Sequence, residues 1–313
     1  IVGCAHGLSR ATCRLILWAM IAVDWGTSSF RAYRVDTDGR IIDRRSAARG
    51  ILSVAPGEFA AVLSEEIGAW LDHETSAVFM SGMIGSRQGW KEVPYLPCPV
   101  DLDTIARACA EVDWDRGRRV FIAPGLSCRD AQGVPDVMRG EETQIIGAID
   151  ELGPDAVVCL PGTHSKYVRV RDRRIVDFTT HMTGEAFGVL WRHSILGRLG
   201  DTEAVDDDTA FDAGVDRSAD GQGLLHHLFG VRSRGLFGEM PASSLASYLS
   251  GILIGHEIRA AAPPAPVAVI GEAVLVRLYC RAFARCGIPS RPVAGEPAPR
   301  GLWAIARASG ALT

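Results

Sequence analysis

The stretch Ile21-Ala-Val-Asp-Trp-Gly-Thr-Ser-Ser-Phe-Arg-Ala-Tyr-Arg-Val35 indicates the fold class of this chain. An apolar strand runs into Asp24, a Gly-Thr-Ser-Ser turn follows, and a second, alternating strand leaves the turn. Gly26 lets the backbone approach a phosphate closely, and the hydroxyls of Thr27 and Ser28 can donate to its oxygens. A carboxylate just before such a turn can hold the hydrated Mg²⁺ that accompanies a nucleotide. The alternative is a plain hairpin in which Asp24 caps the turn.

Length and composition narrow the class of protein. The chain has 313 residues, enough for two domains of ordinary size, and its apolar and charged fractions of 47% and 22% are typical of a globular protein. The net charge of −4 gives no reason to propose nucleic acid or an anionic membrane as a partner. The eight cysteines include no C-x-x-C pair, so neither a zinc site nor a disulfide framework is indicated. A cytoplasmic location fits best.

The first nineteen residues are expected to precede the fold. Their apolar run, which extends through 15–23, resembles a short signal segment, but no small-residue cleavage site follows it. Asp24 also interrupts the run too early for a membrane span. We therefore expect Met20 to be the native start and residues 1–19 to be a non-native or disordered extension.

The remaining chain alternates strands and helices. The strand–loop–hairpin layout of residues 21–44 recurs at 156–178, so the chain resembles two similar halves, divided as 20–150 and 151–313. The patterns predict helices at 59–71, 104–112 and 141–149, strands at 77–80, 119–123, 156–160, 167–170 and 174–178, and a long connection at 124–139.

The second unit, Cys159-Leu-Pro-Gly-Thr-His-Ser-Lys-Tyr-Val168, carries a second phosphate-binding pattern. Gly162 and Thr163 follow a strand as Gly26 and Thr27 do, but without the acidic residue. Two such turns facing each other could hold the β- and γ-phosphates of a nucleotide. Lys166 is either a charge partner for a phosphate or a solvent-exposed lysine. His164 is either a phosphate donor or a solvated loop histidine.

Three further segments have both a functional and a plain explanation. Glu141 and Glu142 follow Gly140 in the first turn of a helix, where acidic residues oppose the helix dipole. One of them could instead remove a proton from a sugar hydroxyl. Gly271 and Glu272, in Val267-Ala-Val-Ile-Gly-Glu-Ala-Val274, either seat an adenosine or form an ordinary strand-to-helix connection. The third segment is the glycine-rich loop Ser81-Gly-Met-Ile-Gly-Ser-Arg-Gln-Gly-Trp90.

Together and in this order, these segments resemble the actin–hexokinase–heat-shock-70 ATPase superfamily over nearly all of residues 21–313. DWGTSSFRAY, LPGTHSKY and VIGEA resemble its two phosphate motifs and its adenosine motif. SGMIGSRQGW, MRGEETQIIGA, LPGTHSKYV and HMTGEAFGVL are similar to the 2-dehydro-3-deoxygalactonokinase family. The resemblance implies two similar actin-like (ribonuclease H-like) α/β domains with a nucleotide cleft between them.

The same resemblance implies a reaction and its partners. The expected partners are ATP, Mg²⁺ and a small sugar acid, with a homodimer as an option. The reaction would transfer the γ-phosphoryl group to the C6 hydroxyl of 2-dehydro-3-deoxy-D-galactonate, giving 2-dehydro-3-deoxy-6-phospho-D-galactonate in galactonate catabolism. The alternatives are a kinase for an epimeric or related sugar acid and a non-catalytic sugar-binding regulator on the same fold. The sequence offers no Walker A loop, Rossmann fingerprint, H-E-x-x-H or G-x-S-x-G pattern.

The resemblance also implies roles for individual residues. Glu141 would be the base, although many sugar kinases of the superfamily have Asp after the glycine, and Asp24 would orient Mg²⁺ through water. Arg87 is the leading candidate to bind the substrate carboxylate, with Arg31 behind it, because arginine pairs bidentately with carboxylates. The nucleotide would contact Gly26, Thr27, Ser28, Gly162, Thr163, His164, Lys166, Gly271 and Glu272. The substrate would also contact Ser81, Gly82, Met83 and Trp90.

Overall fold

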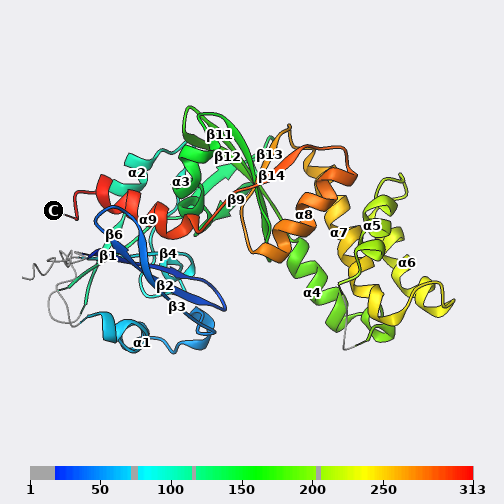
Figure 1. Cartoon of the computed structure of the whole chain (residues 1–313), viewed down its shortest axis with the longest axis horizontal. Coiled ribbons are helices and arrows are strands. Elements are labelled where there is room, and N and C mark those ends of the chain that lie inside the picture. The colour runs from blue at the N-terminus through cyan, green and yellow to red at the C-terminus, as the bar shows by residue number, and fades with distance from the viewer. Residues whose placement is uncertain (1–17, 72–76, 115–117, 202–205, 313) are drawn as a thin grey trace, which may run out of the picture.

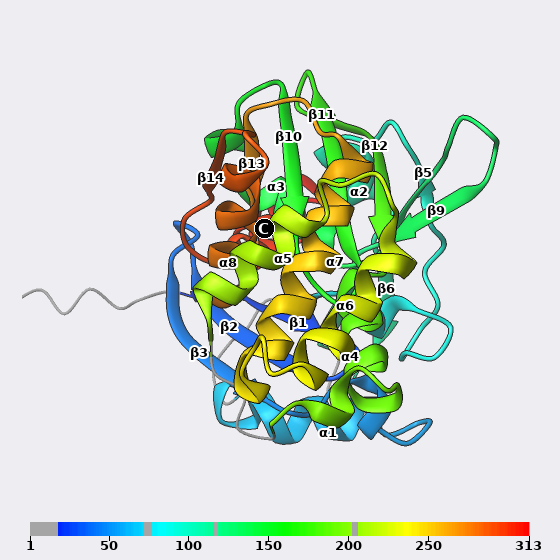
Figure 2. The ribbon, with the colours of Figure 1, turned by 90° about the vertical axis from the view of Figure 1, so that its right-hand side faces the viewer.

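The computed structural model describes residues 18–71, 77–114, 118–201 and 206–312. Figure 1 shows an elongated molecule with a mixed sheet and helix α1 at one end and helices α4 to α8 at the other. In Figure 2 these last helices face the viewer and cover the second sheet. The chain therefore folds as two α/β parts, as predicted.

The first sheet places Asp24 at the carboxyl end of a central strand. Strand β1 pairs antiparallel with β2 and parallel with β4, and Asp24 lies opposite Ser81 at the end of β4. Carboxyl ends of parallel strands are where α/β sheets bind ligands. The strand order is β3-β2-β1-β4-β7-β6, with bounds β1 Trp18–Trp25, β2 Phe30–Asp36, β3 Ile41–Ala47, β4 Ala77–Ser81, β6 Ala110–Asp113 and β7 Arg119–Ile122.

The second sheet repeats this arrangement. Strand β10 pairs antiparallel with β11 and parallel with β13, as β1 does with β2 and β4. The order is β12-β11-β10-β13-β14, with bounds β10 Ala156–Leu160, β11 Ser165–Arg171, β12 Arg174–His181, β13 Val267–Val269 and β14 Ser290–Pro292. The expected repeat of the two halves is confirmed. A small third sheet has the order β5-β8-β9, at Leu96–Pro97, Leu126–Arg129 and Pro135–Met138.

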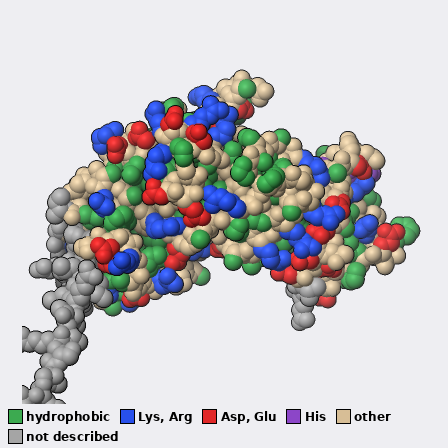
Figure 3. All heavy atoms as spheres, turned by 45° about the horizontal axis from the view of Figure 1, so that its top comes forward, with side chains coloured by type: hydrophobic (Ala, Val, Ile, Leu, Met, Phe, Trp, Pro, Cys, Tyr) green, Lys and Arg blue, Asp and Glu red, His purple; other side chains and the backbone are tan. Residues whose placement is uncertain are grey.

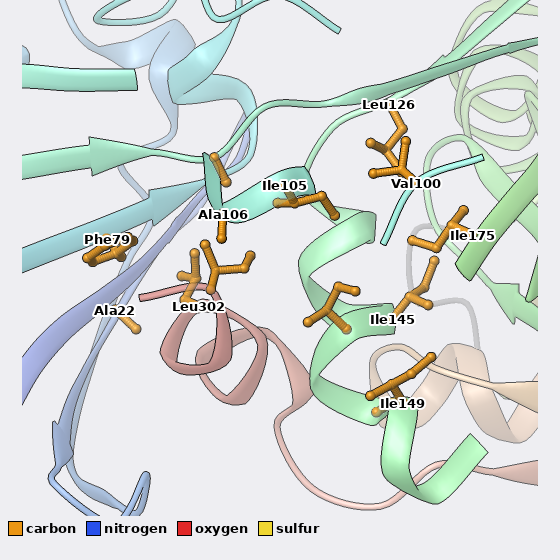
Figure 4. Packing of buried hydrophobic residues seen from close by; sticks show 14 of the residues in the cluster. Ala22, Phe79, Val100, Ile105, Ala106, Leu126, Ile145, Ile149, Ile175 and Leu302 are labelled. Atoms are coloured by element: carbon orange, nitrogen blue, oxygen red, sulfur yellow. The ribbon is translucent and has the colours of Figure 1, made fainter. Parts of the chain in front are cut away.

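Two helices, α3 and α9, join the sheets through one hydrophobic core. Ala22 of β1 and Phe79 of β4 belong to the same buried cluster as Ile145 of α3 and Leu302 of α9, as Figure 4 shows. Val158 of β10 belongs to it as well. The helices are α1 Phe59–Ile67, α2 Leu102–Arg107, α3 Glu141–Leu152, α4 Thr183–His193, α5 Asp208–Arg217, α6 Leu224–Leu236, α7 Leu245–Ala261, α8 Ala273–Arg285 and α9 Pro297–Ala308.

The α3–α9 contact is backbone against backbone at two glycines. A β-carbon on Gly301 would lie 1.8 Å from the Thr143 carbonyl oxygen, and one on Gly147 would lie 1.9 Å from that of Pro297. No side chain larger than hydrogen fits at either position without moving a helix. This contact fixes α3, whose first residue is Glu141.

Three expectations need correction. The helix predicted at 104–112 ends at Arg107, and residues 110–112 lie in β6, which alternates partly buried and exposed side chains. The connection at 124–139 contains the antiparallel pair β8–β9. Of the predicted 1–19 extension, residues 1–17 lie outside the described residues, whereas 18–19 belong to β1, which pairs Trp18 with Asp36.

The last helix returns to the first half of the chain. Helix α9 lies against α2, α3, β1 and β4, although it follows the second sheet in sequence. Figure 1 shows it, in red, beside the blue strands of the first sheet.

Neither the charges on the surface nor the helices of the described residues indicate a membrane partner. On the face drawn in Figure 3, Lys and Arg side chains lie among Asp and Glu side chains. Within the described ranges, no helix combines the length and apolar character needed to cross a membrane.

Candidate active site

A cavity of about 800 Å³ lies where the carboxyl ends of β1 and β10 face each other. Both glycine–hydroxyl turns contribute to its wall, and so does the start of α3. The lining residues are Asp24, Gly26, Thr27, Arg31, Tyr33, Arg44, Arg45, Ser46, Gly82, Met83, Arg139, Gly140, Glu141, Gln144, Leu160, Pro161, Gly162, Thr163, His164, Ile270, Gly271, Glu272, Leu275, Val293, Gly295, Glu296, Pro297, Ala298 and Pro299. We call this cavity the cleft.

Asp24 is a partly buried carboxylate that lines the cleft. Burial raises the pKa of its carboxyl to about 6, Arg31 lowers that pKa, and the Glu141 carboxylate raises it. Among the described residues its ion-pair partner is Arg31, whose Nη1 lies 3.9 Å from Asp24 Oδ2. A desolvated carboxylate with so little compensation is well suited to a positively charged ligand.

Arg31 links two of the predicted motifs. Its Nη2 donates to Glu272 Oε1 at 2.6 Å, so the start of β2 meets the turn between β13 and α8 across the cleft. The side chain of Arg31 is 39% exposed. The ion pair therefore joins the expected first phosphate motif to the expected adenosine motif at the solvent side.

Glu141 begins α3 at the point where the two halves meet. Its Oε2 accepts a hydrogen bond from the Arg139 backbone N–H at 3.0 Å. Its Oε1 lies 3.4 Å from Lys166 Nζ, which comes from β11 of the other sheet. Gly140, just before it, has φ of 108° and approaches Gly82 so closely that a β-carbon would lie 3.2 Å from the Gly82 Cα. The base candidate thus stands beside the loop expected to bind the sugar.

Glu142 faces the other way. Its side chain is fully buried, and both carboxyl oxygens accept from the Gly140 N–H, at 2.9 and 2.7 Å. Burial raises the pKa of this carboxyl to about 8. Glu142 is absent from the cleft lining, as the helical geometry between adjacent residues predicts.

Lys166 and His164 are both paired. Lys166 is only 4% exposed, so the alternative of a solvent-exposed lysine is wrong. Its Nζ donates to the His164 carbonyl at 3.1 Å as well as facing Glu141. His164 Nε2 lies 2.5 Å from Glu185 Oε2 at the start of α4, so this ring is partnered rather than merely solvated.

The glycine-rich loop contributes only some of its predicted residues. Gly82 and Met83 line the cleft, whereas Ser81 is fully buried and accepts from the Thr143 hydroxyl at 3.3 Å. Trp90 packs against the apolar cluster under the first sheet. Arg87 is 86% exposed, lies 3.5 Å from Glu92, and is not among the cleft-lining residues.

The sequence reading missed Arg139. It is 9% exposed, lines the cleft and is adjacent to Gly140 in the MRGEE segment. That adjacency was the available signal, because only Gly140 separates this basic residue from the base candidate, Glu141. Gln144, one turn along α3, also lines the cleft and was not predicted.

A second, apolar cavity of about 310 Å³ adjoins the cleft. Gly162 and Leu275 line both cavities, so the two are neighbours. Phe187, Leu253 and Leu278 from α4, α7 and α8 give the second cavity its apolar walls. A flat, apolar ring system would suit this space.

The cleft offers carboxylates rather than a complete metal cage. Across residues 18–71, 77–114, 118–201 and 206–312, no three His, Cys, Asp or Glu side chains gather so as to hold a metal ion. Asp24, whose charge is under-compensated, supplies the hard oxygen ligand that Mg²⁺ prefers. Mg²⁺ usually keeps several waters and is held by one or two carboxylates plus phosphates. The donor set therefore fits a hydrated Mg²⁺ that arrives with a nucleotide.

Known proteins resemble this chain over most of its length. A family model described as 2-keto-3-deoxy-galactonokinase matches residues 24–305. A 2-dehydro-3-deoxygalactonokinase from Escherichia coli strain K12 is 36% identical, covering 92% of this chain and 97% of that protein. A Rhizobium meliloti strain 1021 protein assigned the same activity is 41% identical, over 92% and 96%. The crystal structure of a Sinorhizobium meliloti protein assigned likewise has a TM-score of 0.85 and 38% identity, over 92% of this chain and 98% of that chain.

Proposed function

We propose, from the premise that this chain belongs to the 2-keto-3-deoxy-galactonokinase family, that it transfers the γ-phosphoryl group of ATP to the C6 hydroxyl of 2-dehydro-3-deoxy-D-galactonate. The chain is an ATP-dependent sugar-acid kinase of galactonate catabolism. The product of this reaction is 2-dehydro-3-deoxy-6-phospho-D-galactonate.

One observation carries the residue-level proposal. Asp24, both glycine–hydroxyl turns and Glu141 come from separate segments, and all four line one cleft between the two sheets. If Asp24 only capped the turn of a hairpin, these four segments would have no reason to line the same cleft. Phosphoryl transfer asks for it, because catalysis of that reaction rests on alignment and on neutralising the phosphate oxygens.

The nucleotide would lie along the two adjoining cavities. The adenine would occupy the apolar cavity beside Leu275, next to Gly271 and Glu272, which line the adjoining cleft. The β- and γ-phosphates would lie between Gly26–Ser28 and Gly162–His164, whose backbone N–H groups and hydroxyls can donate to them. Mg²⁺, held through water by Asp24, would supply positive charge to the phosphate oxygens.

The sugar acid would enter beside Gly82 and Met83. Glu141 would accept the C6 proton as the new O–P bond forms, in a position fixed by its hydrogen bond from the Arg139 N–H. Lys166 faces Glu141 from the opposite half, so its charge lies beside both the base and the second phosphate turn. Closure of the two halves would exclude water that would otherwise hydrolyse ATP.

Three broader proposals accompany the reaction. We propose a cytoplasmic location because all six cysteines in the described residues are free thiols. We propose that the chain divides into two domains at residue 150, one around each large sheet, and that helix α9 packs against the first domain. A homodimer is a prediction that light scattering on the purified protein would check.

The direct test is a phosphorylation assay with a panel of sugar acids. Purified protein, MgATP and 2-dehydro-3-deoxy-D-galactonate should give a 6-phosphate, identified by phosphorus–proton NMR coupling to the C6 protons. The gluco epimer and the unoxidised parent acids are the comparison substrates. ADP release without a sugar phosphate would contradict a kinase, and binding without turnover would favour the sugar-binding regulator.

A further inference from the structure

A chain of buried hydrogen bonds connects helices α7 and α8 with the second phosphate turn, Gly162–His164. Glu257 of α7 is buried, and its two carboxyl oxygens accept from the hydroxyls of Tyr167 at 3.0 Å and of Tyr279 at 2.8 Å. The Tyr279 hydroxyl oxygen also lies 2.7 Å from Ser165 Oγ. Ser165 is fully buried at the start of β11 and directly follows the turn in sequence.

The hydrogen bond between Tyr279 and Ser165 has one possible direction. A tyrosine hydroxyl carries a single proton, and burial raises the pKa of Tyr279 well above its usual range, so the proton stays in place at neutral pH. Tyr279 donates this proton to Glu257 and can therefore only accept from Ser165. The Ser165 hydroxyl thus has no proton left for a phosphate, and its role is to anchor the chain.

Tyr279 belongs to both parts of the proposed nucleotide site. Its side chain, on α8, lines the apolar cavity proposed for the adenine, while its hydroxyl ends at Ser165 beside the phosphate turn. The start of α4 holds the middle of the same turn, where the Glu185 backbone N–H donates to the Thr163 carbonyl at 3.0 Å. The Ser165 side chain gives the turn a second anchor at its downstream end.

We infer that Tyr279 is a positioning residue that fixes the second phosphate turn through Ser165. Glu257 orients the Tyr279 hydroxyl for this task by accepting its proton. Loss of the bond to Ser165 would loosen the turn and misplace the β- and γ-phosphates, whereas the aromatic wall of the adenine cavity would remain. This inference rests on the proposed function and names the group that sets the geometry of one of its phosphate turns.

The test compares two nucleotides across variants that each lose one oxygen atom. Isothermal titration calorimetry would measure binding of AMP and of the non-hydrolysable ATP analogue AMPPNP, both with Mg²⁺, to wild type, Tyr279→Phe and Ser165→Ala. Both variants remove the hydrogen bond and keep the aromatic ring. The ratio of AMPPNP affinity to AMP affinity should fall by about tenfold in each, with AMP affinity within about threefold of wild type. In turnover, kcat should fall by about tenfold or more, with the KM for the sugar acid within about twofold.

Tyr167→Phe is the matched control. It removes the other tyrosine donor to Glu257 and leaves a buried carboxyl oxygen without that donor, as Tyr279→Phe does, but the Tyr167 hydroxyl bonds to Glu257 and not to Ser165. The control should therefore lose about as much thermal stability as Tyr279→Phe, while its nucleotide affinity ratio stays within about threefold of wild type. A role confined to folding predicts the same ratio for both tyrosine variants.

Each outcome decides for or against Tyr279. The double variant Ser165→Ala/Tyr279→Phe should be within about twofold of either single variant, because both substitutions remove the same bond. Losses that multiply, an unchanged ratio in either folded single variant, an equal loss of affinity for both nucleotides, or an equal fall of the ratio in Tyr167→Phe would overturn the inference. Ser165→Ala tests the same bond if Tyr279→Phe does not fold. If the ratios change as expected but wild type does not phosphorylate the sugar acid, the proposed function fails while the inference stands.

Discussion

Replacing Asp24 by Asn should inactivate the enzyme and stabilise its fold at neutral pH. The Asp24 carboxyl has its pKa raised from the ordinary 3.8 to about 6, mainly by burial. Ionised at pH 7, it therefore costs the folded state about 3 kcal/mol relative to the unfolded chain. Asn keeps the shape and removes the charge, so the free energy of unfolding should rise by roughly 1–3 kcal/mol.

The sign of the pH dependence follows from the raised pKa. Below pH 3.8 both states hold the proton, and Asp24 adds no penalty. As the pH rises through the window from 3.8 to about 6, the unfolded chain loses its proton first, so the stability associated with protonated Asp24 is lost. The advantage of Asn should therefore grow by roughly 1–2 kcal/mol between pH 5 and 7.5.

Urea unfolding at several pH values, without nucleotide, measures this advantage directly. Asp38→Asn, in the exposed turn after β2, is the surface control and should change stability by less than about 0.5 kcal/mol. The same Asp24→Asn protein should lose roughly 10²-fold or more in kcat and still bind the sugar acid. A less stable Asp24→Asn protein at pH 7, a pH-independent gain, or activity within a few fold of wild type at saturating Mg²⁺ would refute the reasoning.

Two further predictions concern the scaffold and the charge partner of the base. Gly301→Ala places a methyl group against the Thr143 carbonyl and should lower the free energy of unfolding, measured in urea, by about 1–3 kcal/mol. A methyl group in Gly68→Ala meets nothing within 4 Å, so this control should not be destabilised. Equal effects of the two substitutions would contradict the packing argument. Lys166→Met removes the buried cation facing Glu141 and should lower kcat by roughly 10²–10³-fold in steady-state assays; a kcat within threefold of wild type would make Lys166 structural.

Local sequence patterns predicted the repeated sheets well. The apolar strands and the glycine turns at Gly26 and Gly162 depend on nearby residues, so their order alone indicates two similar halves and the two turns that line the cleft. The β8–β9 pair was missed because its short strands, such as Leu126–Arg129, carry little apolar alternation. Strand β6 was taken for the end of a helix because four residues cannot distinguish the two periods.

The sequence predicted the parts of the candidate site that lie in local motifs, but not how far each side chain is buried in the folded protein. Gly82 and Met83 line the cleft as expected, but a loop sequence does not show which side chains turn outward, and Arg87 does. Arg139 was missed because its burial is created by Val93 and Tyr95, which are far from it in sequence. Such burial is a tertiary property.

The central claim is that Glu141 is the base of a sugar-acid kinase, and a paired single-turnover experiment tests it most directly. Glu141 faces the cleft and Lys166, whereas the neighbouring Glu142 is fully buried against the Gly140 N–H. With saturating MgATP and sugar acid, Glu141→Gln should slow phosphoryl transfer by roughly 10²–10⁴-fold, with modest changes in substrate affinity.

Glu142→Gln is the matched control on the same helix turn. Burial raises the pKa of Glu142 to about 8, so a neutral amide resembles its state at pH 7, and the transfer rate should stay within a few fold of wild type. Loss of phosphoryl transfer in Glu142→Gln, with nearly normal transfer in Glu141→Gln, would show that Glu142 and not Glu141 is the base. Normal transfer in both variants would contradict the account.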